Sequence, residues 1–149
     1  MGAKPIGGGL PLGGILAGEQ LASLLEPGTH GTTFGGNPVA CAAGAAVLTE
    51  ILNKKLMEHA QEMGSLLMNG LMQLARKYTG VIREVRGFGL MVGAELHRDA
   101  EPVVVSMRDR GILVNGTDNT VVRFLPPLIV SADQVRLTLS TFEDVLKGT

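Results

Sequence analysis

The chain has no tryptophan, and its aromatic residues amount to only 3% of the sequence. No apolar run approaches the ~20 residues that a membrane-spanning helix needs, so we expect no membrane segment. An excess of charge is also missing, because 13 Lys and Arg residues stand against 14 Asp and Glu residues. Without a basic excess or a basic run, nucleic acids and anionic membrane surfaces are not expected as partners.

Cysteine is nearly absent as well. Cys41 is alone, which excludes an internal disulfide and fits a reducing compartment. It lies in the small-residue run 40–46 with no charged neighbour to activate it, so we interpret it as a buried structural thiol. His30, His59 and His97 are scattered without metal-ligand spacing, and we predict no metal site. The first residues fit neither a myristoylation signal nor an uninterrupted secretory signal, and we therefore expect a cytoplasmic protein.

Glycine is abundant instead, with 21 of 149 residues, which indicates loops that approach other groups closely. Residues 1–36 combine many of these glycines with few apolar positions of regular spacing. A short helix is predicted over 19–25, ended by Pro27 and Gly28. We interpret this part of the chain as loops of a larger domain.

Two long helices are expected next. Asn37 can cap the first, and Pro38 suits its first position, so a helix is predicted from Pro38 to Leu52. It is rich in alanine, and Gly44 permits close approach, so we expect it to be buried on most sides. The second helix is predicted over 54–77, where apolar residues recur at spacings of three and four.

From residue 81 onward the pattern changes to the order β-β-α-β-β-α. Strands are predicted over 81–86, 88–96, 112–114 and 120–124, with a turn over 115–119 and a helix over 101–110. Ser131 and Gln134 form a capping box at the start of a last helix. This order predicts a compact α+β unit of roughly 70 to 95 residues with its own core.

Lys4 lies in the run 3–13, AKPIGGGLPLG, in which an alanine-lysine pair precedes a glycine triplet and a proline turn. A lysine near a chain start is usually a solvated surface group. The run resembles, however, the segment around the cofactor-bearing lysine of class III aminotransferases. That resemblance implies that Lys4 bonds the aldehyde of pyridoxal phosphate and moves a proton at the substrate carbon.

Two further segments resemble the same family. Residues 31–38, GTTFGGNP, are similar to its loop that serves the cofactor phosphate across a dimer interface, which implies the Thr33 hydroxyl and the Thr32 amide as donors. A capped turn before a helix is the alternative. Residues 121–128, VVRFLPPL, are similar to the segment whose arginine holds the substrate α-carboxylate, which implies that role for Arg123. The alternative is an ordinary strand arginine in a partly buried ion pair.

The resemblance implies an α/β fold, namely a fragment of a fold type I transferase that depends on pyridoxal phosphate. Residues 1–52 would be the end of the large domain with a connecting helix, and residues 53–149 a C-terminal α+β small domain. Residues 85–96 resemble a strand pair of that small domain and are assigned to structure. The family's phosphate-cradling loop, ring-stacking aromatic and pyridine-binding aspartate have no counterpart in this chain.

The implied reaction moves an amino group from N-acetylornithine to 2-oxoglutarate in a homodimer, within arginine biosynthesis. Ornithine, 4-aminobutyrate and succinyl-ornithine are alternative donors. A different class of function also stays open, namely a non-catalytic α+β domain for dimerisation or regulation that descends from such an enzyme.

Overall fold

The structure is a computed structural model that describes residues 2–3, 5–24, 26 and 28–148. The chain forms two compact units, Met1–Lys55 (unit 1) and Leu56–Thr149 (unit 2). The division falls in the short connection between two helices, and the sequence analysis sets it after residue 52.

Unit 1 contains little regular structure before its long helix. Strand β1 (Gly2–Ala3) pairs antiparallel with β2 (Gly13–Gly14), and a 3-10 turn η1 (Pro5–Gly7) lies between them. Helix α1 (Glu19–Ala22) is a single turn, shorter than the helix predicted over 19–25. Most of residues 15–36 form turns and irregular loops, in agreement with the glycine-rich sequence.

Helix α2 (Pro38–Asn53) begins where the sequence predicts, because the Asn37 side chain accepts a hydrogen bond from the Ala40 amide at 2.9 Å. The segment 6–12 lies directly on this helix. A Cβ at Gly44 would lie only 2.4 Å from Leu12 Cδ2, so a larger residue there would displace the Leu12 side chain. The close approach expected at Gly44 is therefore confirmed.

Two predictions about α2 are wrong. Ala40 and Gly44 are its buried residues, so the helix is not buried on most sides. Cys41 is exposed and is not a buried structural thiol. The reason is the helical period, which places residues 40 and 44 on one stripe and turns residue 41 by about 100° away from it.

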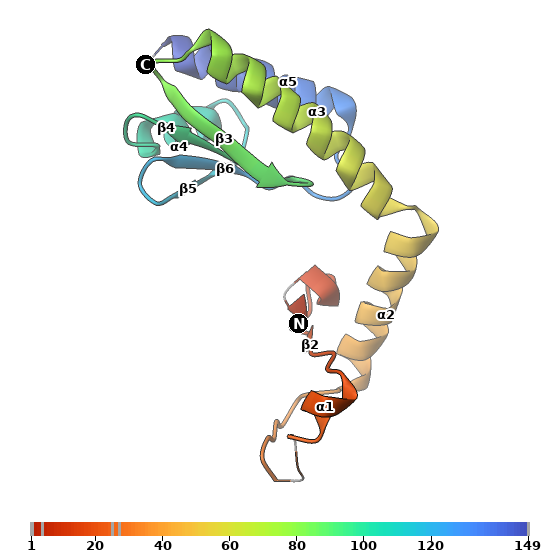
Figure 1. The fold of residues 1–149 in the computed structure, drawn as a ribbon. Coiled ribbons are helices and arrows are strands. Elements are labelled where there is room, and N and C mark those ends of the chain that lie inside the picture. Colours follow the sequence, from red (N-terminus) through yellow and green to blue (C-terminus); the bar gives the residue numbers. More distant parts are fainter. Residues whose placement is uncertain (1, 4, 25, 27, 149) are drawn as a thin grey trace. The chain divides into compact units, whose positions relative to one another are not determined.

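Unit 2 contains a four-stranded antiparallel sheet with the strand order β3-β4-β6-β5 and three helices (Figure 1). The predicted order β-β-α-β-β-α is confirmed. The elements are α3 (Leu56–Lys77), β3 (Ile82–Phe88), β4 (Met91–Leu96), α4 (Glu101–Asp109), β5 (Asn115–Thr117), β6 (Val121–Phe124) and α5 (Ala132–Lys147).

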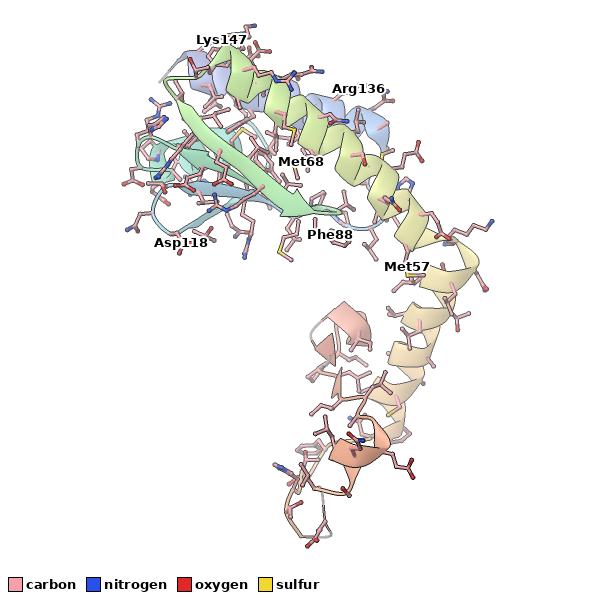
Figure 2. All side chains as sticks on the ribbon, viewed as in Figure 1. Met57, Met68, Phe88, Asp118, Arg136 and Lys147 are labelled. Carbon is pink, nitrogen blue, oxygen red and sulfur yellow. The ribbon has the colours of Figure 1, made fainter. Side chains whose placement is uncertain are left out.

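Strand β5 does not lie where the sequence predicts. Residues 112–114 are irregular, and the strand takes the first three residues of the predicted turn 115–119. The turn is tighter than expected, because Asp118 and Asn119 both adopt positive φ, at 50° and 60°. Asp and Asn tolerate that conformation better than other residues with a side chain. Asn115 to Thr117 are therefore free to pair with β6 (Figure 2 marks Asp118 at this turn).

The core of unit 2 lies between the sheet and its helices. Helices α3 and α5 lie side by side across one face of the sheet, and α4 packs against α5 and β5 (Figure 1). The rings of Phe124 and Phe142 meet edge to face at 5.2 Å between centroids. Other core side chains are Met63, Leu67, Leu71, Leu74, Ile82, Val92, Ala94, Leu96, Val103, Met107, Val122, Val135, Val145 and Leu146.

Helix α5 carries the predicted capping box, in which the Ser131 hydroxyl accepts from the Gln134 amide at 3.2 Å and the Gln134 side chain accepts from the Ser131 amide at 2.9 Å. Among the described residues, none of the helices has the length and apolar character needed to cross a bilayer.

Candidate functional site

The two faces of the unit 2 sheet have opposite chemistry, because successive residues of a strand point to opposite sides. On β4, Val92, Ala94 and Leu96 are fully buried against the helices, with at most 1% of their surface exposed. Met91, Gly93 and Glu95 therefore belong to the other side. We call this side the outer face of the sheet. In addition to those three residues of β4 it carries Glu84, Arg86, Phe88, Asn115, Thr117, Val121 and Arg123.

One row of residues crosses all four strands of the outer face. Arg86 on β3 pairs with Gly93 on β4, Gly93 pairs with Arg123 on β6, and Arg123 pairs with Asn115 on β5. Gly93 has no side chain, and Val121 occupies part of the space over it, because a Cβ at Gly93 would lie 3.1 Å from Val121 Cγ1. Arg86 and Arg123 therefore lie on either side of a position without a side chain of its own.

Arg123 is half-buried, and its Nε is buried without a hydrogen-bond partner. No ion pair to Arg123 occurs within the part of the chain that the structure describes. The alternative of an ordinary arginine in a partly buried ion pair is thus not found among these residues. A buried donor without an acceptor is costly, by ~1 to 3 kcal/mol. Arg123 is therefore well suited to bind a carboxylate, which its planar fork can accept through two hydrogen bonds.

The other charges of the outer face are paired with each other. Glu95 accepts hydrogen bonds from Arg83 Nη1 at 3.0 Å and from Arg86 Nη1 at 2.5 Å, and Arg86 also donates to Glu84 at 2.9 Å. The hydrogen bond from Arg86, more than any other cause, holds the pKa of Glu95 below its ordinary value. We call Arg83, Glu84, Arg86 and Glu95 the ion cluster. Its two carboxylates are already occupied.

The ion cluster was not predicted from the sequence. Alternation within each strand was the available signal, but it places Glu84 and Arg86 on the side of Glu95 only once Phe88 is known to pair with Met91. The hydrogen bond from Arg83 to Glu95 could not be predicted from this alternation. The pairing of β3 with β4 shifts between Ile82 and Glu84, so that Arg83 is an extra residue beside Glu95.

The predicted phosphate-binding threonines lie in one exposed turn of unit 1. Thr32 Oγ1 accepts a hydrogen bond from the Gly35 amide at 3.2 Å, and its hydroxyl proton remains able to donate. A Cβ at Gly35 would lie 2.1 Å from Thr32 Cγ2, so a larger residue there would displace the Thr32 side chain. The Thr33 side chain is exposed. The structure thus brings Thr32 and Thr33 together.

Lys4, the predicted cofactor-bearing residue, lies outside the described residues. Its neighbours in sequence are described: Ala3 pairs with Gly13 in the small sheet, and η1 begins at Pro5. The glycine triplet that follows makes a tight turn in which Gly8 and Gly9 have φ values of 58° and 108°.

Unit 2 also has an apolar groove of about 700 Å³ between α3 and the turn that joins β3 to β4. Its lining includes Met57, Met68, Phe88 and Leu128, and it contains no ionisable side chain. Figure 2 shows Phe88 at the end of β3 and Met57 and Met68 on α3. This groove offers no acid–base chemistry. Within the described residues, no cluster of His, Cys, Asp and Glu could hold a metal ion.

The architecture of this chain is that of a known class of enzymes. The family model described as Aminotransferase class-III matches residues 1–146, and the chain belongs to that family. Over 145 residues it is 43% identical to the acetylornithine aminotransferase of Caldanaerobacter subterraneus, covering 97% of this chain and 36% of the relative. Over 146 residues it is 41% identical to ornithine aminotransferase 1 of Staphylococcus aureus, with the same coverage of each protein.

Solved structures agree with this assignment. The acetylornithine aminotransferase of Elizabethkingia anophelis matches 99% of this chain with a TM-score of 0.89 and 29% identity, over 38% of its own length. The ornithine aminotransferase of Toxoplasma gondii matches 85% of this chain with a TM-score of 0.78 and 33% identity, over 31% of its length. The fold is therefore that of part of an aminotransferase, as the sequence predicts. The chain spans about a third of the length of the curated relatives it matches.

Proposed function

We propose that this chain forms the C-terminal part of an aminotransferase that depends on pyridoxal phosphate. In the whole enzyme, a cytoplasmic homodimer, an amino group passes from N-acetylornithine or a similar ω-amino donor to 2-oxoglutarate, within arginine biosynthesis. One observation carries the proposal, namely that Arg123 on the outer face of the sheet is half-buried and that its Nε has no partner among the described residues. The curated relatives named acetylornithine and ornithine aminotransferases support the donor class.

Arg123 has the chemistry that both substrates require. The donor and the acceptor each carry an α-carboxylate, and a guanidinium binds such a group through two charge-assisted hydrogen bonds. The carboxylates of the ion cluster are already bound to other arginines. In this proposal Arg123 binds and orients the substrate carboxylate.

The described residues of unit 1 fit the cofactor by the chemistry of their donors. The hydroxyls of Thr32 and Thr33 lie in an exposed turn, and hydroxyl groups are good phosphate ligands. The amides of Gly35, Asn37 and Ala40 already have acceptors within this turn, so the hydroxyls of Thr32 and Thr33 remain as donors in front of α2. We assign Thr33 and Thr32 to the cofactor phosphate of the partner subunit.

Lys4 is assigned to the cofactor's aldehyde and to the proton that moves at the reacting carbon. Pyridoxal phosphate, when bound, supplies the electron sink that makes this carbon acidic. A neutral amine is needed for both tasks of Lys4.

Covalent trapping tests the assignment of Lys4. The chain is incubated with pyridoxal phosphate, reduced with borohydride and digested, and the peptide masses are measured. We expect the cofactor's mass on the peptide that contains Lys4, and its loss in Lys4→Ala. Labelling of Lys54 and Lys55 in the same sample measures non-specific reaction. Equal labelling of all three lysines would contradict the assignment.

A second candidate function has its own supporting observation, because unit 2 contains a complete apolar core. Such a unit could act as a non-catalytic dimerisation or regulatory domain. The trapping experiment is therefore repeated after co-expression with the upstream part of the Caldanaerobacter relative. Absence of a Lys4-dependent label and of transamination in both samples would favour the non-catalytic domain.

A further inference from the structure

Glu95 is close enough in register to compete for Arg123. On β4 it lies two residues from Gly93, the residue that pairs with Arg123, so Glu95 and Arg123 are diagonal neighbours on the outer face. Diagonal neighbours in a sheet are about 7 to 8 Å apart at their Cα atoms, within reach of long side chains. Glu95 has the same diagonal relation to Arg86 on the other side. Its carboxylate can therefore turn to either arginine.

The structure shows which arginines hold this carboxylate. One oxygen of Glu95 accepts from Arg83 and the other from Arg86, and the Glu95 side chain is only 16% exposed. The irregular pairing at Ile82 and Glu84 makes this possible, because it adds Arg83 to β3 beside Glu95. With both oxygens occupied, Glu95 is turned away from Arg123.

The balance of charges leads to the same result. Three arginines (83, 86 and 123) and two glutamates (84 and 95) lie in this part of the sheet. Pairing within the ion cluster occupies both glutamates and leaves the guanidinium of Arg123 without a partner among the described residues.

We propose that Arg86, assisted by Arg83, is a positioning residue that holds Glu95 away from Arg123 and so keeps Arg123 available for the substrate carboxylate. The inference rests on the proposed function, since it gives Arg123 its carboxylate ligand. Arg86 itself makes no contact with substrate in this proposal. Loss of Arg86 frees one oxygen of Glu95, which then pairs with Arg123 and competes with the ligand.

The test observes Arg123 directly in the 149-residue chain. The Nε–Hε signal of Arg123 is followed by nitrogen-15 NMR, assigned with Arg123→Lys, and 2-oxoglutarate is the titrated probe. In Arg86→Gln we expect this signal to move before any ligand is added. The affinity for 2-oxoglutarate should fall by about fivefold, the size expected for one exposed ion pair.

Three further variants separate positioning from general effects. Arg86→Lys keeps the positive charge beside Glu95 and should retain most of the affinity. The double variant Arg86→Gln, Glu95→Gln removes the competitor and should restore the wild-type affinity. Arg136→Gln, which breaks an exposed ion pair with Asp133 on α5, removes the same charge elsewhere and should change neither readout.

The outcomes distinguish the inference from the proposed function. An unchanged Arg123 signal and affinity in Arg86→Gln would overturn the inference, and so would a double variant as weak as the single one. If 2-oxoglutarate leaves the wild-type Arg123 signal unmoved, the carboxylate role of Arg123 fails. The ligand-free shift in Arg86→Gln then still decides whether Glu95 competes for Arg123. If Arg86→Gln does not fold, Arg83→Gln, which removes the other bond to Glu95, replaces it.

Discussion

Unit 2 has a core of large apolar side chains, and the described residues of unit 1 form no such core. In unit 2, Leu71 and Phe142 are completely buried, and the core is continuous from α3 to α5. In unit 1, Leu16 is 98% exposed and Phe34 is 79% exposed. Unit 2 thus has the contacts of an independent domain, whereas unit 1 presents apolar surface that its own residues do not cover.

Helices α2 and α5 show where this difference comes from. Both have 16 residues and a capping side chain at the start, Asn37 for α2 and Ser131 for α5. Helix α5 has its apolar residues on one stripe, which packs against the core. Helix α2 is alanine-rich, and its larger residues Val39, Leu48 and Leu52 are exposed. A capping side chain therefore sets the start of a helix in either unit. Burial of the helix needs, in addition, an apolar surface against which its side chains can pack.

The relatives suggest what covers the apolar surface of unit 1. The chain spans about a third of their length, and exposed apolar surface of this kind is typical of interfaces. We expect that other parts of the class III fold cover it. The predictions below test the contrast between the units, using the fluorescence of Tyr78. This residue is the only tyrosine of the chain and lies in unit 2, so its signal follows the unfolding of that unit.

The largest effect is expected from Phe142→Ala. The Phe142 ring is fully buried against Phe124, and removing a buried ring costs about 3 to 5 kcal/mol. Urea unfolding followed by Tyr78 fluorescence should show a midpoint shifted strongly towards lower urea. Phe34→Ala in unit 1 is the matched control and should leave the midpoint unchanged. A comparable loss in both variants would contradict the contrast between the units.

A smaller loss is expected from Gly64→Ala on α3. A Cβ at Gly64 would lie 2.2 Å from the Gly89 carbonyl oxygen, so the turn between β3 and β4 must move. Overpacking of this kind costs about 1 to 3 kcal/mol and outweighs the better helix propensity of alanine. Urea midpoints by Tyr78 fluorescence measure it. Gly80→Ala, where a Cβ meets nothing within 4 Å, controls for the loss of glycine and should not destabilise unit 2.

A still smaller loss of stability is expected from removing a helix cap in each unit. Ser131→Ala removes the capping box of α5 and should cost about 1 kcal/mol in the Tyr78 transition. Asn37→Ala removes the equivalent cap of α2 and should lower the helical circular dichroism without moving that transition. A shift of the Tyr78 midpoint in Asn37→Ala would indicate that the two units unfold together.

The sequence predicted best where local chemistry decides the structure. Caps at Asn37 and Ser131, the amphipathic spacing of α3 and the order of elements in unit 2 each depend on neighbours within a few residues. The position of β5 was missed because the left-handed conformation of Asp118 and Asn119 shortens the turn. The burial of α2 was overestimated because, among the described residues, the segment 6–12 covers only the stripe of Ala40 and Gly44.

In the candidate site, too, some features were predicted from the sequence and others were not. Arg123 was found through its sequence motif, and the structure adds that its Nε has no partner among the described residues. The ion cluster depends on the register of β3 and β4 and on an irregularity within it, neither of which alternation alone specifies. The roles of Lys4, Thr32, Thr33 and Arg123 stay predictions for the trapping and binding experiments.

The smallest effect is a pH dependence that unit 2 should show and unit 1 should not. Glu143 on α5 accepts hydrogen bonds from Lys77 Nζ at 2.6 Å and from the Tyr78 hydroxyl at 3.0 Å, and the bond from Lys77 is the main reason that its pKa is lowered. A carboxyl whose pKa is lower in the folded state stabilises the fold above its unfolded pKa, and this contribution is lost as the pH falls through the folded value.

Glu143→Gln should therefore lower the urea midpoint at neutral pH, and the difference in midpoint from wild type should disappear in acid, below about pH 4. Glu50→Gln, which removes the exposed pair with Lys54 in unit 1, should show no such difference in the Tyr78 transition. A difference that widens on acidification would contradict the role of Glu143, because a protonated carboxyl no longer accepts the charged bond from Lys77.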